Sequence, residues 1–79
     1  MNRFNMVILA LKPPTPKQVL SARTKAGLTQ TQAANIVCVR RGAWARWEVD
    51  LKSDLNRSMN PALFEYFLIM TGQIPFKPP

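Results

Sequence analysis

The 79 residues of this chain allow one small domain, and a domain of this size leaves much of its surface exposed, so association with a second chain would help to stabilise it. The sequence has no histidine, which excludes a histidine-based catalytic triad or zinc site. Its one cysteine, Cys38, excludes an intrachain disulfide and fits a reducing cytoplasm.

The net charge of +7 is unevenly distributed along the chain. Residues 1–47 contain eight Lys and Arg and no acid, whereas residues 48–79 contain three Lys and Arg and all four acids. The first part therefore carries +8 and the second −1. A basic lobe of this kind indicates a polyanionic ligand, although a basic excess alone also fits a solvated surface.

Residues 1–14 form an N-terminal arm that ends in a proline pair. The apolar run 6–11 has the composition of a short strand, but an isolated strand is not stable. It must pair with the same segment of a partner chain, lie on the helical core or stay disordered. Its six residues are too few for a secretion signal or a membrane span, which favours a cytoplasmic protein with no membrane partner.

A first helix is expected over about residues 16–26. Thr15 supplies a side-chain oxygen for the N-cap before a proline, and Gly27 suits the left-handed residue that ends many helices. Leu20 is expected to point into the core, flanked by Val19, Ala22 and Ala26. The polar side chains should face water, namely those of Lys17, Ser21, Thr24 and Lys25.

Two short helices joined by a tight turn are expected next, over about residues 30–37 and 40–49. Thr29 caps the first of them, whose small alanines let the second cross closely. Trp44 and Trp47 are three residues apart and share one face, where their expected role is core packing. As exposed rings, they would instead be platforms on which single-stranded bases stack.

After a polar loop at residues 50–60, a final helix is expected over about 62–70, in which Glu65 is the only charged residue. Apolar side chains cover nearly its whole circumference, so it must be covered on more than one side. We expect a homodimer in which this helix contributes Leu63, Tyr66, Phe67, Ile69 and Met70. The alternative is an intrachain core closed by the N-terminal arm.

The segment LTQTQAANIVCVRRGAWARWEVD, residues 28–50, resembles without a gap the helix-turn-helix of phage repressors of the Cro and lambda-repressor (XRE) type. The shared pattern is LTQ, a small residue, V-x-R and then RWE. The resemblance covers about residues 16–50 strongly and 60–72 loosely. It implies an all-α, four-helix domain over residues 15–72, between the arm and an irregular tail at 73–79. Double-stranded DNA is then the expected ligand.

Carried over residue by residue, the resemblance assigns contacts with base edges in the major groove to Arg41, Gly42, Ala45 and Arg46. Each arginine can donate two hydrogen bonds to guanine, and an alanine, Ala45 or Ala43, can meet a thymine methyl. Gln30 matches the family's glutamine that binds a backbone phosphate at the positive end of a helix. Further candidates for phosphate contacts, which position the protein without reading sequence, are Arg40, Thr29, Thr31, Lys52 and Arg57. For Arg40 the reason is that its side chain cannot cap a helix.

The resemblance also matches Arg23 and Glu48 to a buried ion pair, with an independent surface role as the alternative for Arg23. Two positions depart from the family. Cys38 stands where the family has a left-handed glycine, which implies strain or a different turn; a redox-sensing thiol is the alternative. Gly42 costs about 0.5 to 1 kcal/mol relative to alanine. A glycine at this position is explained by close approach of the backbone to DNA, by avoidance of a clash, or by neutral drift.

The leading hypothesis is a sequence-specific transcriptional repressor of phage or mobile-element type that binds an inverted-repeat operator as a homodimer and regulates its own promoter. Small size fits Cro-like regulators and anti-CRISPR-associated autorepressors. It would be nucleoid-associated, use no metal or cofactor, and not be an enzyme. The alternatives are an antitoxin or adaptor protein whose apolar last helix binds another protein, and a nonspecific binder of RNA or single strands.

Overall fold

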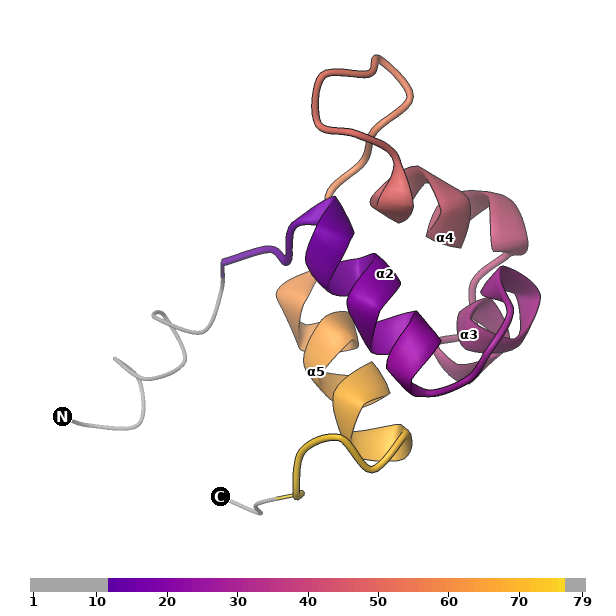
Figure 1. Cartoon of the computed structure of the whole chain (residues 1–79), viewed down its shortest axis with the longest axis vertical. Coiled ribbons are helices and arrows are strands. Elements are labelled where there is room, and N and C mark those ends of the chain that lie inside the picture. The colour runs from indigo at the N-terminus through magenta and orange to yellow at the C-terminus, as the bar shows by residue number, and fades with distance from the viewer. Residues whose placement is uncertain (1–11, 77–79) are drawn as a thin grey trace, which may run out of the picture.

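The computed structural model describes residues 12–76; residues 1–11, which contain the expected strand, and 77–79 lie outside the described part. The described residues contain four helices, namely α2 (Pro16–Lys25), α3 (Gln30–Ile36), α4 (Arg41–Glu48) and α5 (Pro61–Met70) (Figure 1). Residues 12–76 contain no strand, so the expected all-α class is confirmed for them.

The core lies where α4 packs against α2 and α3, and α5 closes it against α3. Its largest fully buried side chains are those of Trp44, Phe67, Met59 and Val19. Residues 49–60 project as a loop from the end of α4 before the chain returns to α5 (Figure 1). The domain is therefore built around one aromatic side chain from α4 and one from α5.

Two predictions about burial are wrong. Leu20 does not point into the core, because 42% of it is exposed while its neighbour Val19 is fully buried. Val19 and Ala22 form the buried stripe of α2, and Leu20 lies about 100° around the helix axis from Val19. Phe67 does not face another subunit, because it is fully buried against Trp44 inside this chain.

Helices α2 and α3 begin with the same pair of reciprocal hydrogen bonds. The hydroxyl of Thr15 accepts from the N–H of Gln18 at 3.2 Å, and the side-chain oxygen of Gln18 accepts from the N–H of Thr15 at 2.8 Å. Thr29 and Gln32 repeat the arrangement at the start of α3. These capping boxes satisfy N–H groups that have no partner within the helix.

Helices α2, α3 and α5 end in the same way. The residue that follows the C-cap has a positive φ, which is 71° at Gly27, 60° at Cys38 and 74° at Gly72. At each end, the N–H groups of this residue and of the next one return to carbonyls of the last turn, the two hydrogen bonds of a Schellman motif. In the turn before α4, the backbone of Cys38 thus adopts the left-handed conformation, although the Cβ of a non-glycine residue makes this conformation unfavourable.

Candidate nucleic-acid interface

Glu48, in the last turn of α4, receives hydrogen bonds from three other side chains. Arg23 of α2 donates from Nε at 2.6 Å and from Nη2 at 2.9 Å, so the predicted partners are in contact as a two-bond ion pair. Trp44 donates from its indole N–H at 2.5 Å, and Gln30 donates from Nε2 at 3.1 Å. One carboxylate therefore connects α2, α3 and α4.

These contacts change the protonation of Glu48. Burial by itself would raise the pKa of its carboxyl group, but the hydrogen bonds from Arg23, Trp44 and Gln30, with the charge of Arg23, outweigh burial and lower the pKa below its ordinary value. The hydrogen bonds that Arg23 donates to Glu48 also raise the pKa of Arg23. The pair is therefore fully ionised near neutral pH.

Gln30 extends this network towards the surface of α4. Its side-chain oxygen accepts a hydrogen bond from Nη1 of Arg41 at 3.2 Å, while its amide nitrogen bonds Glu48. The side chain of Gln30 thus orients an exposed arginine in the first turn of α4. Both ends of the amide are engaged within the chain, so a phosphate contact by Gln30 would replace or share one of these bonds.

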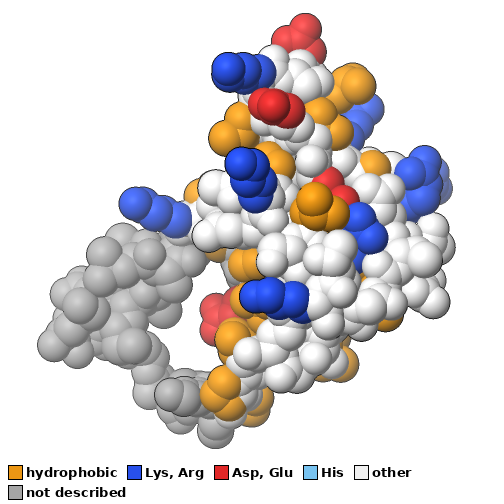
Figure 2. All heavy atoms as spheres, in the orientation of Figure 1, with side chains coloured by type: hydrophobic (Ala, Val, Ile, Leu, Met, Phe, Trp, Pro, Cys, Tyr) orange, Lys and Arg blue, Asp and Glu red, His pale blue; other side chains and the backbone are white. Residues whose placement is uncertain are grey.

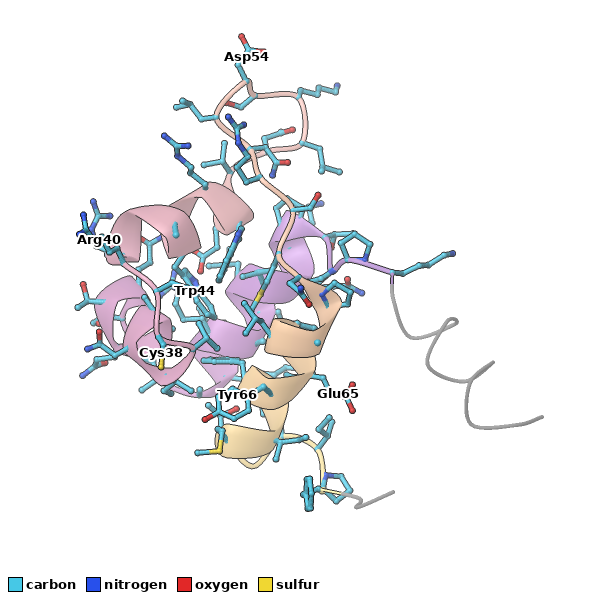
Figure 3. All side chains as sticks on the ribbon, turned by 180° about the vertical axis from the view of Figure 1, so that it is seen from behind. Cys38, Arg40, Trp44, Asp54, Glu65 and Tyr66 are labelled. Atoms are coloured by element: carbon cyan, nitrogen blue, oxygen red, sulfur yellow. The ribbon has the colours of Figure 1, made fainter. Side chains whose placement is uncertain are left out.

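Within residues 12–76, no acidic side chain forms an ion pair with the arginines of α4 or of its N-cap. Arg40, Arg41 and Arg46 are exposed, and within residues 12–76 the ion pair of Arg23 with Glu48 is the only one. Arg40 occupies the N-cap position of α4 without a side-chain cap, at the outer edge of the domain, whereas Trp44 points inward (Figure 3). Lys and Arg side chains also spread over the loop and α4 in Figure 2.

A depression on this surface is lined by Arg40, Gly42, Ala43, Arg46, Trp47 and Arg57. Three of the predicted DNA-contacting arginines therefore meet there, one from the loop and two from α4 and its N-cap. Arg41 is not among the lining residues and lies instead beside Gln30. The structure separates the two arginines to which base contacts were assigned.

The remaining predicted contact residues are not gathered at this depression. Thr29 uses its hydroxyl as the N-cap of α3, Thr31 is exposed on the same helix, and Lys52 is exposed in the loop. Ala45 is half-buried on α4. A Cβ added to Gly42 would meet no atom within 4 Å, so avoidance of a clash inside the chain does not explain this glycine.

The loop after α4 is hydrogen-bonded to the end of that helix through contacts that the sequence does not predict. The side-chain amide of Asn56 donates to the carbonyl of Val49 at 2.7 Å, and the N–H of Arg57 donates to the carbonyl of Arg46 at 3.1 Å. An asparagine eight residues beyond the helix carries no pattern that predicts this. These bonds bring Arg57 back to α4.

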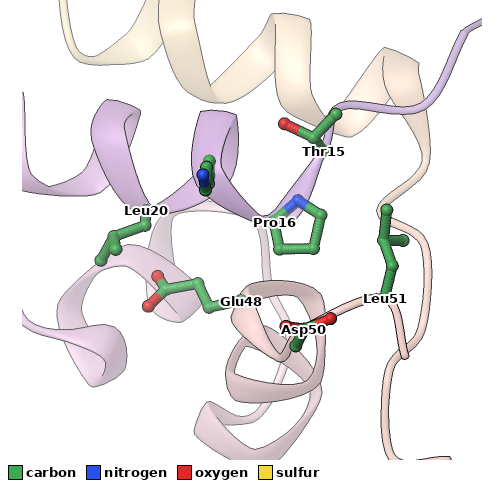
Figure 4. A pocket seen from close by; sticks show the side chains of 7 residues that line it. Thr15, Pro16, Leu20, Glu48, Asp50 and Leu51 are labelled. Carbon is green, nitrogen blue, oxygen red and sulfur yellow. The ribbon is translucent and has the colours of Figure 1, made fainter. Parts of the chain in front are cut away.

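A second hollow lies between the start of α2 and the end of α4 (Figure 4). It is lined by Thr15, Pro16, Lys17, Leu20, Glu48, Asp50 and Leu51. Two carboxylates and one lysine give this hollow no excess of positive charge. It does not belong to a surface that would attract a polyanion.

The surface of α5 that remains free is narrower than predicted. Tyr66 is 45% exposed and Met70 is 58% exposed, and the two are four residues apart on one side of the helix. Leu63 and Ile69 are half-buried. Tyr66 and Glu65 lie on different sides of α5 in Figure 3.

Among the described residues, no helix has the length and apolar character needed to cross a membrane, and no group of three metal-ligating side chains is present. No protein family, curated protein or solved structure matches this chain.

Proposed function

We propose that this protein is a sequence-specific double-stranded DNA-binding regulator and that α4 enters the major groove. The observation that carries the proposal is the array of uncompensated arginines on α4, a helix fixed to the core by Trp44 and Glu48. A rigid basic helix of this kind fits the width of the major groove and attracts the phosphates that flank it. The resemblance of residues 28–50 to the helix-turn-helix of XRE-type repressors supports the same proposal.

Arg41 is the proposed base reader. It lies in the first turn of α4, where recognition helices contact bases, and its guanidinium is held by Gln30. A guanidinium held in one orientation loses less conformational freedom when it donates two hydrogen bonds to guanine. Each such pairing contributes on the order of 1 to 3 kcal/mol of discrimination against a wrong base.

We further propose that the protein binds an inverted repeat as a homodimer. Tyr66 and Met70 are large apolar side chains exposed on one side of α5, which is the surface a second copy would cover. Two-fold symmetry would place the half-sites about one helical turn, roughly 34 Å, apart. Repression of its own promoter and a phage or mobile-element origin rest on the sequence resemblance.

Selection of bound sequences from a random duplex pool, followed by gel-shift titration, tests this function. We expect a palindrome containing guanine, and Arg41→Ala should bind it at least tenfold more weakly and lose the preference at that base pair. Lys25→Ala removes the same charge from α2 and should bind within about twofold of the wild type. Recovery of no preferred sequence would refute sequence-specific binding.

An adaptor or antitoxin function is the second candidate, favoured by the same exposed pair on α5. If a different protein covers Tyr66 and Met70, the purified chain should be a monomer at micromolar concentrations or should aggregate. A stable symmetric dimer measured by light scattering favours the DNA-binding regulator instead.

A further inference from the structure

We propose that the depression lined by Arg40, Arg46 and Arg57 binds one phosphodiester group of the DNA backbone, and that Arg46 is therefore a phosphate ligand rather than a base reader. This inference rests on the proposed function. It divides the two arginines to which base contacts were assigned, leaving Arg41 to read the sequence. We call this depression the phosphate seat.

The residues that line the phosphate seat carry only positive charge. Three arginines line one depression, and no acidic residue lines it. Positive charges that line one depression repel one another, and an anion bound there is attracted to each of them and offsets that repulsion. The planar donor fork of arginine matches the oxygens of a phosphate group.

The fixed position of Arg57 is the second argument. Its Nη1 donates to the carbonyls of Asp54 at 3.0 Å and Asn56 at 2.8 Å, and its backbone N–H donates to the carbonyl of Arg46 at 3.1 Å. Its Nε and Nη2 make no hydrogen bond within the described residues, so they remain free to donate to a ligand. The loop therefore holds a second cation beside Arg46 before any ligand arrives.

The apolar lining of the phosphate seat narrows the ligand from any anion to a phosphodiester. Gly42, Ala43 and Trp47 supply two small residues and one half-buried ring. Because Gly42 has no Cβ, the backbone of α4 is open to close approach. A deoxyribose next to the phosphate offers an apolar face that can pack on the ring of Trp47.

The arrangement around Arg41 is different. Arg41 is outside the lining of the phosphate seat and is hydrogen-bonded to Gln30, which in turn is bonded to Glu48. Arg41 is thus oriented by a neutral amide, whereas Arg46 belongs to a cluster of cations. A single oriented fork suits one base edge, whereas a cluster suits a phosphate.

The test uses the full chain and the duplex that it selects. Affinity is measured at several salt concentrations, and preference is measured by substituting each base pair in turn. Arg46→Ala should weaken binding to all sequences by a similar factor, leave the preference at every base pair unchanged, and reduce the slope of log affinity against log salt by about 0.9. Arg57→Gln should act in the same way, and Lys25→Ala should change neither quantity.

Arg46→Lys keeps the charge but not the planar fork, so it should keep the wild-type salt slope and preference. Thermal unfolding of each variant checks that the domain is intact. If Arg46→Ala or Arg46→Lys loses the preference for one base pair, or if Arg57→Gln leaves affinity and slope unchanged, the phosphate seat is refuted while the proposed function stands. A wild-type protein that prefers no duplex refutes the proposed function itself.

Discussion

The indole ring of Trp44 packs against the phenyl ring of Phe67, with ring centroids 4.9 Å apart and planes inclined by 55°. Both side chains are fully buried. Trp47 adds a second aromatic contact to Trp44 at 5.4 Å. Because α4 carries the exposed arginines, this contact with α5 helps to set the orientation in which they are presented.

Truncation of Phe67 should therefore destabilise the whole domain. Phe67→Ala leaves a cavity beside Trp44, and such losses amount to about 3 to 5 kcal/mol. That is a large part of the total stability expected of a domain this small, roughly 4 to 12 kcal/mol. Urea unfolding followed by tryptophan fluorescence measures the change. Phe76→Ala is the control, because Phe76 is 68% exposed; its effect should stay within about 0.5 kcal/mol.

Loss of the Glu48 carboxylate should also be costly at neutral pH. Glu48→Gln leaves the guanidinium of Arg23, whose side chain is only 17% exposed, without its counter-ion. Removing one partner of a buried pair costs roughly 3 to 5 kcal/mol, and partial exposure of Arg23 places this pair at the lower end. A change below about 1 kcal/mol would show that the ion pair contributes little.

The lowered pKa of Glu48 predicts a pH dependence with a defined sign. The unfolded chain, in which Glu48 has its ordinary pKa of 4.5, takes up the proton before the folded protein does. The contribution to stability is therefore complete above that pKa and is lost as pH falls through the lower value of the folded state. Urea titrations at several acidic pH values should show a smaller decline for Glu48→Gln than for the wild type. Glu65→Gln, which removes an exposed carboxyl group on the side of α5 away from Tyr66, should keep the wild-type decline.

The helices were predictable because their signals are local. Thr15, Thr29 and the glycines that end two helices mark the bounds by chemistry that needs no tertiary context. Helical spacing also separated Trp44 from the polar face of its helix. The same spacing places Val19 and Ala22 on one stripe, and Leu20, the residue after Val19, lies outside that stripe.

The parts that sequence could not predict depend on tertiary packing. Helix α5 is apolar all round, so its pattern does not indicate which side faces the core, and Phe67 was assigned to the wrong surface. The candidate site shows the same limit. Arg46 and Arg57 are eleven residues apart, and only the path of the loop, fixed by Asn56, brings them together.

Replacement of Cys38 by glycine should make the folded domain more stable. An L-residue in the left-handed region costs about 1 to 2 kcal/mol relative to glycine, and the greater freedom of glycine in the unfolded chain offsets about 0.4 to 1 kcal/mol of this. Because Cys38 is exposed, its side chain contributes little packing. Cys38→Gly should therefore raise the free energy of unfolding by about 0.5 to 1 kcal/mol. Gly27→Ala, at the equivalent position of α2, should lower it, and equal signs for the two variants would contradict this account.

Charge placed on the free surface of α5 should prevent self-association. Met70→Glu puts a carboxylate where the proposed second copy would pack, and Met70 is 58% exposed, so the fold should tolerate the change. Light scattering should then report a monomer with an unchanged circular dichroism spectrum. Leu20→Glu is the control, because Leu20 is exposed to a similar extent on another surface. Dissociation by Leu20→Glu and not by Met70→Glu would move the interface to α2.

Gly42 offers a test in which stability and DNA binding should change in opposite directions. Gly42 is the second residue of α4, and a Cβ there meets no atom within 4 Å. Gly42→Ala should raise the free energy of unfolding by about 0.5 to 1 kcal/mol, because alanine loses less backbone freedom on folding. Ala62, the second residue of α5, is the matched position, and Ala62→Gly should lower the free energy of unfolding by a similar amount.

If the backbone at Gly42 approaches DNA closely, the methyl group of Gly42→Ala occupies space that the duplex needs. Gel-shift affinity for the selected operator should then fall at least tenfold in spite of the gain in stability. A variant that is more stable and binds equally well would mean that the glycine has no role in DNA binding. The stability measurement separates that result from a folding defect, because Gly42→Ala cannot bind weakly through unfolding if its free energy of unfolding has risen.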